Sequence, residues 1–171
     1  MRKIKAAAGS VLFAVLAPGC VAGLVPWLLT GWHVGAGGYP AAVVVMGALL
    51  TAAGIIVLSY AFAQFAIDGL GTPAPIAPTA TLVVRGLYKY VRNPMYLAVL
   101  AVILGQALIL ARPILFGYAA VIAALFVAFV RWYEQPTLTR RYGAQYQAYL
   151  RDVPGWWPRL RPGVTNEGGS Q

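Results

Sequence analysis

The chain is poor in the side chains that most soluble enzymes use. Of its 171 residues only 10% are charged, against about 25% in an ordinary globular domain. The hydrophobic share of 60% leaves too little polar surface to cover a soluble fold, which excludes a soluble protein. A single cysteine, Cys20, and a single histidine, His33, exclude a disulfide framework, a zinc site and a Cys/His nucleophile pair. We therefore expect neither metal nor thiol chemistry.

Long uncharged runs dominate what is there. Each run is long enough to cross a hydrocarbon core of about 30 Å at about 1.5 Å per helical residue. The runs are Ala6–Thr30, Pro40–Ile67, Met95–Ala111 and Pro113–Val130. They predict an all-α integral membrane protein with four transmembrane helices. The first run continues well past the length of a signal peptide core, which favours an uncleaved helix.

The basic residues lie almost entirely on one side of these predicted spans. Twelve of the 13 Lys and Arg residues come before the first run, between the second and third, or after the fourth, and Arg112 is the exception. The positive-inside rule therefore predicts cytoplasmic N- and C-termini. We interpret the excess of positive charge as orientation and expect no nucleic-acid partner. The pattern predicts a multi-pass protein of a bacterial inner (plasma) membrane, with any site facing the cytoplasm.

These features divide the chain into five segments. We expect transmembrane helices 1 and 2 in residues 1–67 and a Gly/Pro-rich cytoplasmic cofactor loop in 68–94. We expect a transmembrane hairpin in 95–133, a cytoplasmic interfacial helix with a Trp-rich end in 134–160, and a disordered tail in 161–171. Irregular loops of this length are often functional, so residues 69–78 are a candidate gate. Glycines in the first two runs predict close helix packing: Gly19, Gly23, Gly47 and Gly54.

The interfacial helix is predicted from the spacing of apolar and aromatic side chains after Glu134. They recur at helical spacing on one side, with arginines and glutamines largely elsewhere. The members of this stripe are Leu138, Tyr142, Tyr146, Tyr149 and Leu150. Such a pattern is typical of an amphipathic helix at a membrane surface.

The residues ahead of the third run carry the densest chemistry. Asn93 and Pro94 predict a helix start, with asparagine as N-cap and proline at the first helical position. With Arg92 alongside, the positive end of that helix is suited to a carboxylate or phosphate. The rings of Tyr88 and Tyr96 are suited to a purine or a cationic centre. A ligand with a carboxylate, a purine and a positive sulfur would use all three features.

Glu134 is one of only four acidic residues and follows the fourth run. On a helix it is placed to form an exposed ion pair with Arg131, worth a few tenths of a kcal/mol. A carboxylate at this position is equally suited to an ammonium group. The pattern leaves both interpretations open.

Taken in order, these residues resemble a known family. Gly86, Tyr88, Arg92, Asn93, Pro94 and Tyr96 carry the pattern G-x-Y-x-x-x-R-[HN]-P-x-Y. The pattern continues through Glu134, Leu138, Tyr142, Gly143, Tyr146, Tyr149, Val153 and Pro154. From about Gly69 to Pro158 the chain is similar to the isoprenylcysteine carboxyl methyltransferase and phospholipid methyltransferase family.

The resemblance implies an integral-membrane methyltransferase that uses S-adenosylmethionine. It implies a lipophilic acceptor at the cytoplasmic face: an isoprenoid, a prenyl-cysteine-like carboxylate or a phospholipid. The cofactor contacts it implies are Thr81, Leu82, Val83, Tyr88, Asn93, Pro94, Met95 and Tyr96, with Glu134 at the amino group. The catalytic residues that the resemblance implies are Arg92, Arg131 and Glu134. Arg92 would lie beside the cofactor carboxylate, and Arg131 would lie near the acceptor. Asn93 stands where histidine is commoner, and Gln135 replaces the second acid of an acidic pair.

Two other interpretations fit parts of the chain. Sterol reductases resemble the same region but use NADPH and are much longer. A non-catalytic membrane scaffold would tolerate alanine at Arg92, Tyr96 and Glu134. The residues leave carboxylate, amine and thiol acceptors open, as they do the oligomeric state.

Overall fold

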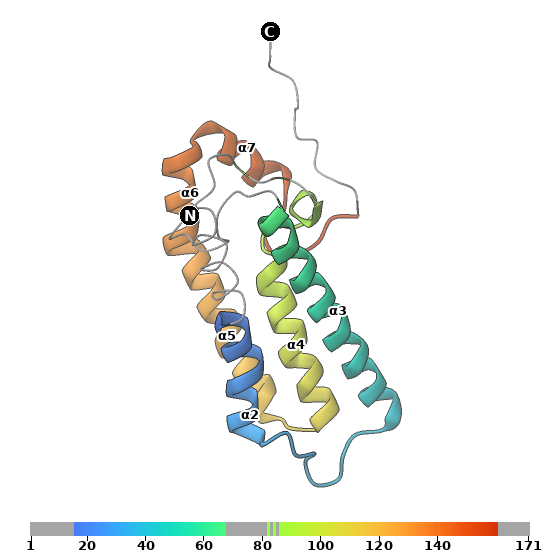
Figure 1. Ribbon diagram of the computed structural model, residues 1–171. Coiled ribbons are helices and arrows are strands. Elements are labelled where there is room, and N and C mark those ends of the chain that lie inside the picture. The colour runs from blue at the N-terminus through green and yellow to red at the C-terminus, as the bar shows by residue number, and fades with distance from the viewer. Residues whose placement is uncertain (1–15, 68–81, 83, 85, 161–171) are drawn as a thin grey trace, which may run out of the picture.

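The computed structural model describes residues 16–67, 82, 84 and 86–160, which form helices and no strand (Figure 1). A π-helix, η1 (Cys20–Leu24), continues into α2 (Val25–Thr30), and α3 (Ala41–Ile67) follows. A short 3₁₀ turn, η2 (Gly86–Lys89), precedes α4 (Pro94–Leu110). After α5 (Ile114–Phe129) come a second π-helix, η3 (Val130–Glu134), and the helices α6 (Gln135–Tyr142) and α7 (Ala144–Asp152).

Two helices have the length and composition of membrane spans. They cover Ala41–Ala63, 23 residues, and Ile114–Tyr142, 29 residues. The helices Leu16–Thr30 and Pro94–Leu110 are apolar but shorter. The all-helical prediction is therefore confirmed for the described part of the chain. Four spans and cytoplasmic termini stay predictions, and residues 6–15 of the first predicted run lie outside the described residues.

Glycines bring α3 and α4 into close contact along their length. A Cβ added at Gly54 would lie 2.8 Å from the carbonyl oxygen of Ala98, and one at Gly47 would lie 2.8 Å from that of Gly105. The close packing predicted from these two glycines is confirmed. At the other two, Gly19 and Gly23, an added Cβ would meet no atom of another described segment within 4 Å.

Both π-helices end two residues before a proline, Pro26 in α2 and Pro136 in α6. Proline has no N–H, and its ring clashes with the carbonyl four residues earlier, so the preceding helical turn widens. Ahead of Pro26 this frees two carbonyl oxygens inside the bundle. The Tyr118 hydroxyl donates to the oxygen of Val21 at 2.7 Å, and the Gln106 amide donates to that of Ala22 at 2.6 Å. Neighbouring side chains thus replace the lost backbone bonds.

At the opposite end from α7, the connection between α2 and α3 is tied to the turn between α4 and α5. The Gly35 N–H donates to the carbonyl of Leu110 at 2.8 Å. Arg112 Nε donates to the carbonyl of His33 at 2.9 Å. These bonds fix the short connections at this end of the bundle.

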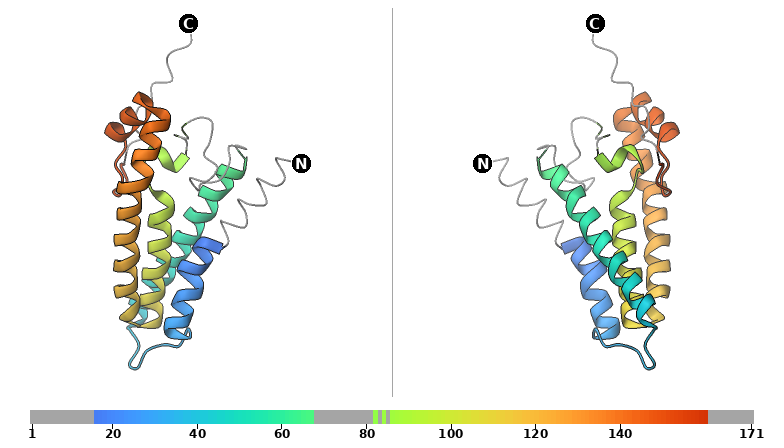
Figure 2. Two further views of the ribbon diagram at one scale, coloured as in Figure 1. Left: turned by 90° about the vertical axis from the view of Figure 1, so that its left-hand side faces the viewer. Right: turned by 90° about the vertical axis from the view of Figure 1, so that its right-hand side faces the viewer.

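The elements α5, η3 and α6 form one continuous rod. From Ile114 to Tyr142 the rod is about 43 Å long, which exceeds a hydrocarbon core of about 30 Å. With Ile114 at one membrane boundary, Glu134 lies about 30 Å along the rod, at the other boundary. Both views in Figure 2 show α6 and α7 rising beyond the ends of α3 and α4. In Figure 1, α7 crosses back over that end of the bundle.

The predicted interfacial helix is two helices, which corrects the sequence interpretation. They meet at Gly143, whose φ of 53° and ψ of −126° lie in a region open essentially to glycine. The predicted stripe packs inward instead of lying free for the membrane. Tyr146, Tyr149 and Val153 are buried, and Leu82, Val84, Leu138, Tyr142 and Leu150 pack against them. The pattern could not indicate a partner for this face, because Leu82 and Val84 are distant from it in the chain.

Candidate active site

The start of α4 follows the predicted pattern, with one difference. Asn93 is the N-cap and Pro94 is the first helical residue, where its fixed φ and missing N–H are tolerated. The Asn93 side chain, however, makes no capping bond. It donates instead to the carbonyl of Gly155 at 3.1 Å. The first turn of α4 therefore lacks a side-chain cap and keeps its positive end.

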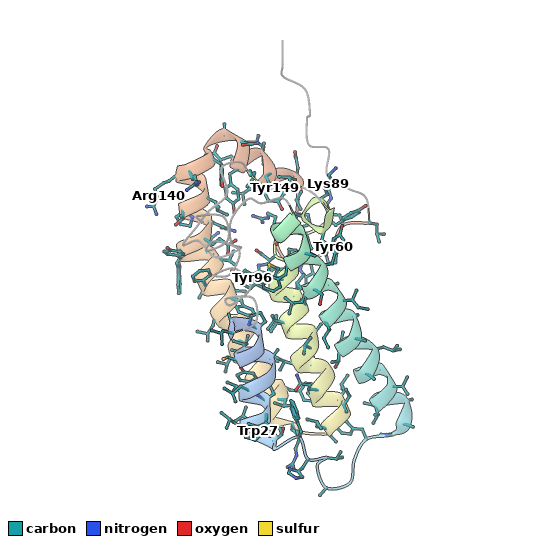
Figure 3. All side chains as sticks on the ribbon, viewed as in Figure 1. Trp27, Tyr60, Lys89, Tyr96, Arg140 and Tyr149 are labelled. Carbon is teal, nitrogen blue, oxygen red and sulfur yellow. The ribbon has the colours of Figure 1, made fainter. Side chains whose placement is uncertain are left out.

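The chain after α7 is bound to the chain before α4. Two backbone hydrogen bonds join them, Arg92 N–H to Pro154 O (2.9 Å) and Arg159 N–H to Tyr90 O (3.0 Å). From α7 itself, the Tyr149 hydroxyl donates to Tyr88 O at 2.8 Å. Figure 3 shows Tyr149, Lys89 and Tyr96 at the same end of the bundle, opposite Trp27. Two segments about 60 residues apart in sequence thus form one structural unit at this end.

Tyr96 links this unit to the long rod. Its hydroxyl donates to Glu134 Oε2 at 2.9 Å, which joins the first turn of α4 to the last residue of η3. The Tyr96 ring lies 4.6 Å from the Phe126 ring and 6.4 Å from the Trp156 ring, measured between centroids. The carboxylate of Glu134 is therefore directed to α4, whereas Arg131 on the same π-helix is exposed.

Arg92 lies in the same cluster. Its side chain hydrogen-bonds the Tyr146 hydroxyl, and its charge acts on Glu134. A Cβ added at Gly155 would lie 3.1 Å from its Nη2. Its Nε is buried and has no hydrogen-bond partner among the residues that the structure describes. A buried guanidinium N–H without an acceptor is costly, and an anionic ligand oxygen would supply that acceptor.

The tyrosines around Arg92 are neutral at physiological pH. Burial raises the pKa of Tyr88 far above its usual value, and the negative charge of Glu134 adds to the rise. Burial also raises the pKa of Tyr149 and of Tyr146, with Arg92 opposing the rise in both. These hydroxyls act as hydrogen-bonding groups and not as bases. Among the described residues, no group of three His, Cys, Asp or Glu side chains is placed to hold a metal.

Most of the predicted site residues come together. Arg92, Asn93, Pro94, Met95 and Tyr96 surround the start of α4, Tyr88 lies in η2 just before it, and Glu134 reaches it from η3. Leu82 packs against the buried tyrosines of α7. Thr81, Val83 and the predicted gate at 69–78 lie outside the described residues. Arg131 is exposed, and the described contacts do not join it to the cluster.

Sequence reasoning missed four participants in this cluster. They are Phe126 and Trp156 beside Tyr96, Gly155 as acceptor for Asn93, and the bond from Arg92 to Tyr146. All four contacts join residues distant in the chain. The one local signal was Pro136, which indicates a disturbed helix at the turn that carries Glu134.

Comparisons with known proteins indicate a family for this chain. The phospholipid methyltransferase family model matches residues 42–145, from α3 to the start of α7. The chain is 35% identical over 71 residues to a phosphatidylethanolamine N-methyltransferase of Phaeosphaeria nodorum. That alignment covers 42% of this chain and only 8% of the fungal protein. No solved structure matches the chain. Since the family model covers more than half of its length, the chain belongs to the phospholipid methyltransferase family.

Proposed function

We propose that the protein is an integral-membrane methyltransferase that uses S-adenosylmethionine to methylate a phospholipid at the cytoplasmic face. One observation carries the proposal. An unpartnered Arg92 Nε, the uncapped start of α4 and the Glu134 carboxylate lie in one cluster. Family membership supports the reaction type, and the name of the fungal relative supports an amine acceptor.

The proposed topology has four spans with both termini in the cytoplasm. The exposed arginines after α5 support this orientation because all of them lie in the part of the chain beyond the C-terminal end of that helix. They are Arg131, Arg140, Arg141, Arg151 and Arg159. Arg112 is the one basic residue described at the opposite end. The positive-inside rule then places the cluster of Arg92 and Glu134 at the cytoplasmic boundary.

The donor set fits the polar groups of S-adenosylmethionine. Arg92 and the N–H groups of the first turn of α4 would hold its carboxylate. Glu134 would hold its ammonium group, and the rings of Tyr88 and Tyr96 would lie beside its adenine or sulfonium. When bound, the cofactor would supply a methyl group on a positively charged sulfur; the nucleophile would bond to the methyl carbon, and the sulfur would leave as a neutral thioether.

The residues of the chain would mainly align the reactants and exclude water. The leaving group is neutral, so no acid is needed to stabilise it. An amine acceptor has to lose its proton before it attacks. The raised pKa values of Tyr88 and Tyr149 keep both hydroxyls protonated at physiological pH, so neither can accept this proton. This leaves the Glu134 carboxylate and interfacial water to take the proton.

The test is a calorimetric titration of the purified protein with S-adenosylhomocysteine and, separately, with NADPH. We expect S-adenosylhomocysteine to bind. Arg92→Gln and Glu134→Gln should each raise its dissociation constant about tenfold, because each removes one charge-assisted hydrogen bond to the ligand. Arg140→Gln, which removes an exposed charge from α6, is the matched control and should bind as the wild type does. Binding of NADPH alone would favour the reductase interpretation instead.

A second measurement addresses the acceptor. The protein is incubated with S-adenosylmethionine carrying a labelled methyl group and with either phosphatidylethanolamine or a prenyl-cysteine analogue. We expect label in the phospholipid. Label only in the prenyl-cysteine analogue would keep the methyltransferase activity and overturn the phospholipid assignment.

A further inference from the structure

The segment Val153–Leu160 after α7 has an inner side that holds the candidate site. The carbonyl of Pro154 accepts from the Arg92 N–H, and the carbonyl of Gly155 accepts from the Asn93 side chain. Val153 itself is fully buried. The backbone at the start of α4 therefore depends on where this segment lies.

The outer side of the same segment is uncovered. The Trp157 side chain is 82% exposed and Leu160 is fully exposed. Arg159 and, on the last turn of α7, Arg151 are exposed as well. Two exposed apolar side chains, Trp157 and Leu160, thus lie beside two exposed arginines, and this combination fits a partner that offers both apolar and anionic contacts.

The position of this surface indicates which partner that is. The Arg159 N–H donates to the carbonyl of Tyr90, four residues before the apolar helix α4 begins. Figure 1 shows the chain after α7 turning back toward that end of the bundle. The segment thus lies at the level where an apolar span meets water, where tryptophan rings sit among lipid headgroups. Its arginines complement anionic headgroups.

We propose that a docking surface made of Arg151, Trp157, Arg159 and Leu160 binds anionic phospholipid headgroups, and that this contact steadies Arg92 and Asn93 at the candidate site. Each arginine near an anionic membrane surface is worth about a fivefold change in binding. The contact is electrostatic in part, so it weakens as ionic strength rises. The enzyme would then sense the charge of the membrane in which it works.

The lipid contact is tested without any cofactor. The protein is placed in nanodiscs of phosphatidylcholine alone, or with about one third phosphatidylglycerol, a strongly anionic surface. A brominated lipid in each disc quenches nearby tryptophans, and Trp157→Phe isolates the contribution of Trp157. We expect stronger quenching of Trp157 in the anionic discs. Equal quenching in both would overturn the proposal.

The coupling to the site is read by hydrogen exchange at Arg92 N–H and Arg159 N–H, which are bonded across the two segments. We expect exchange to be about fivefold slower in anionic discs, as for one arginine contact. Arg151→Gln/Arg159→Gln should remove the difference, and Arg140→Gln should keep it. Equal exchange rates of these N–H groups in neutral and anionic discs containing the wild type would overturn the coupling.

Two further outcomes are distinguishable. If Trp157→Ala changes the oligomeric state in discs, the partner of this surface is a second copy of the chain, and the proposal fails. The effect of lipid charge on S-adenosylhomocysteine affinity rests on the proposed function. Loss of that binding in all discs, with quenching and exchange as expected, would overturn the proposed function and leave the lipid contact standing.

Discussion

The hydrogen bond from Tyr96 to Glu134 is expected to hold the start of α4 against the long rod. Its length is 2.9 Å and its acceptor is a carboxylate. Hydrogen bonds to charged groups contribute about 1.5–3 kcal/mol to the stability of soluble proteins. Double-mutant cycles on hydrogen bonds between helices within a membrane give about 0.6 kcal/mol on average and about 1.7 kcal/mol at most. This contact lies at the boundary and has a charged acceptor. We therefore expect a coupling of about 1.5 kcal/mol between Tyr96→Phe and Glu134→Gln.

The measurement is a double-mutant cycle on the free energy of unfolding in detergent, without cofactor. Tyr96→Phe keeps the ring that stacks on Phe126, so the cycle isolates the hydroxyl. The control cycle pairs Tyr96→Phe with Tyr133→Phe, an exposed position on the same π-helix, and should be additive. If the effects of Tyr96→Phe and Glu134→Gln add within about 0.3 kcal/mol, the hydrogen bond between these side chains does not stabilise the fold.

Three other perturbations follow from the packing and the titration of the site. Gly105→Ala should lower the free energy of unfolding by about 1–3 kcal/mol, because the added methyl group collides with Thr51 on α3; unchanged stability would contradict the close contact. Pro136→Ala restores a backbone N–H, lets the π-helix tighten and turns Glu134 away from α4. S-adenosylhomocysteine affinity should then fall about tenfold with helix content unchanged, and full affinity would show that the π-helix does not position Glu134. Burial raises the pKa of Tyr149, so its neutral form stabilises the fold below about pH 10 and this contribution is lost as pH rises toward the raised value. The unfolding temperature of the wild type should be constant up to about pH 9 and fall above about pH 10. It should fall less steeply in Tyr149→Phe; an equally steep fall in both proteins would show that ionisation of Tyr149 does not cause it.

The features that sequence predicts well are those set by local patterns. The second predicted run, Pro40–Ile67, becomes α3 at Ala41–Ile67 because a long apolar stretch between polar ends leaves few alternatives to a helix. The start of α4 at Asn93 and Pro94 is confirmed because proline tolerates only the first turn. The resemblance to the family also rests on local order, in the pattern that runs from Gly86 to Tyr96 and continues from Glu134 to Pro154.

The features that sequence did not predict depend on contacts between distant segments. Asn93 bonds Gly155 rather than its own helix, because the backbone after α7 offers a carbonyl at that point. The tyrosine stripe of α7 faces inward because the chain around Leu82 and Val84 covers it. The helix breaks at Gly143, where the backbone adopts a conformation with positive φ. Glycine allows this conformation but also fits within a helix, so the sequence alone does not predict the break.

We propose that Arg92 and Glu134 hold a methyl donor for transfer to a lipid amine. Transfer of labelled methyl groups from S-adenosylmethionine to phosphatidylethanolamine in nanodiscs tests it most directly. We expect labelled phospholipid with the wild type and with Arg140→Gln, and no label with Arg92→Gln or Glu134→Gln in proteins that remain folded. Equal labelling by all four proteins, or none by a folded wild type that binds NADPH, would contradict it.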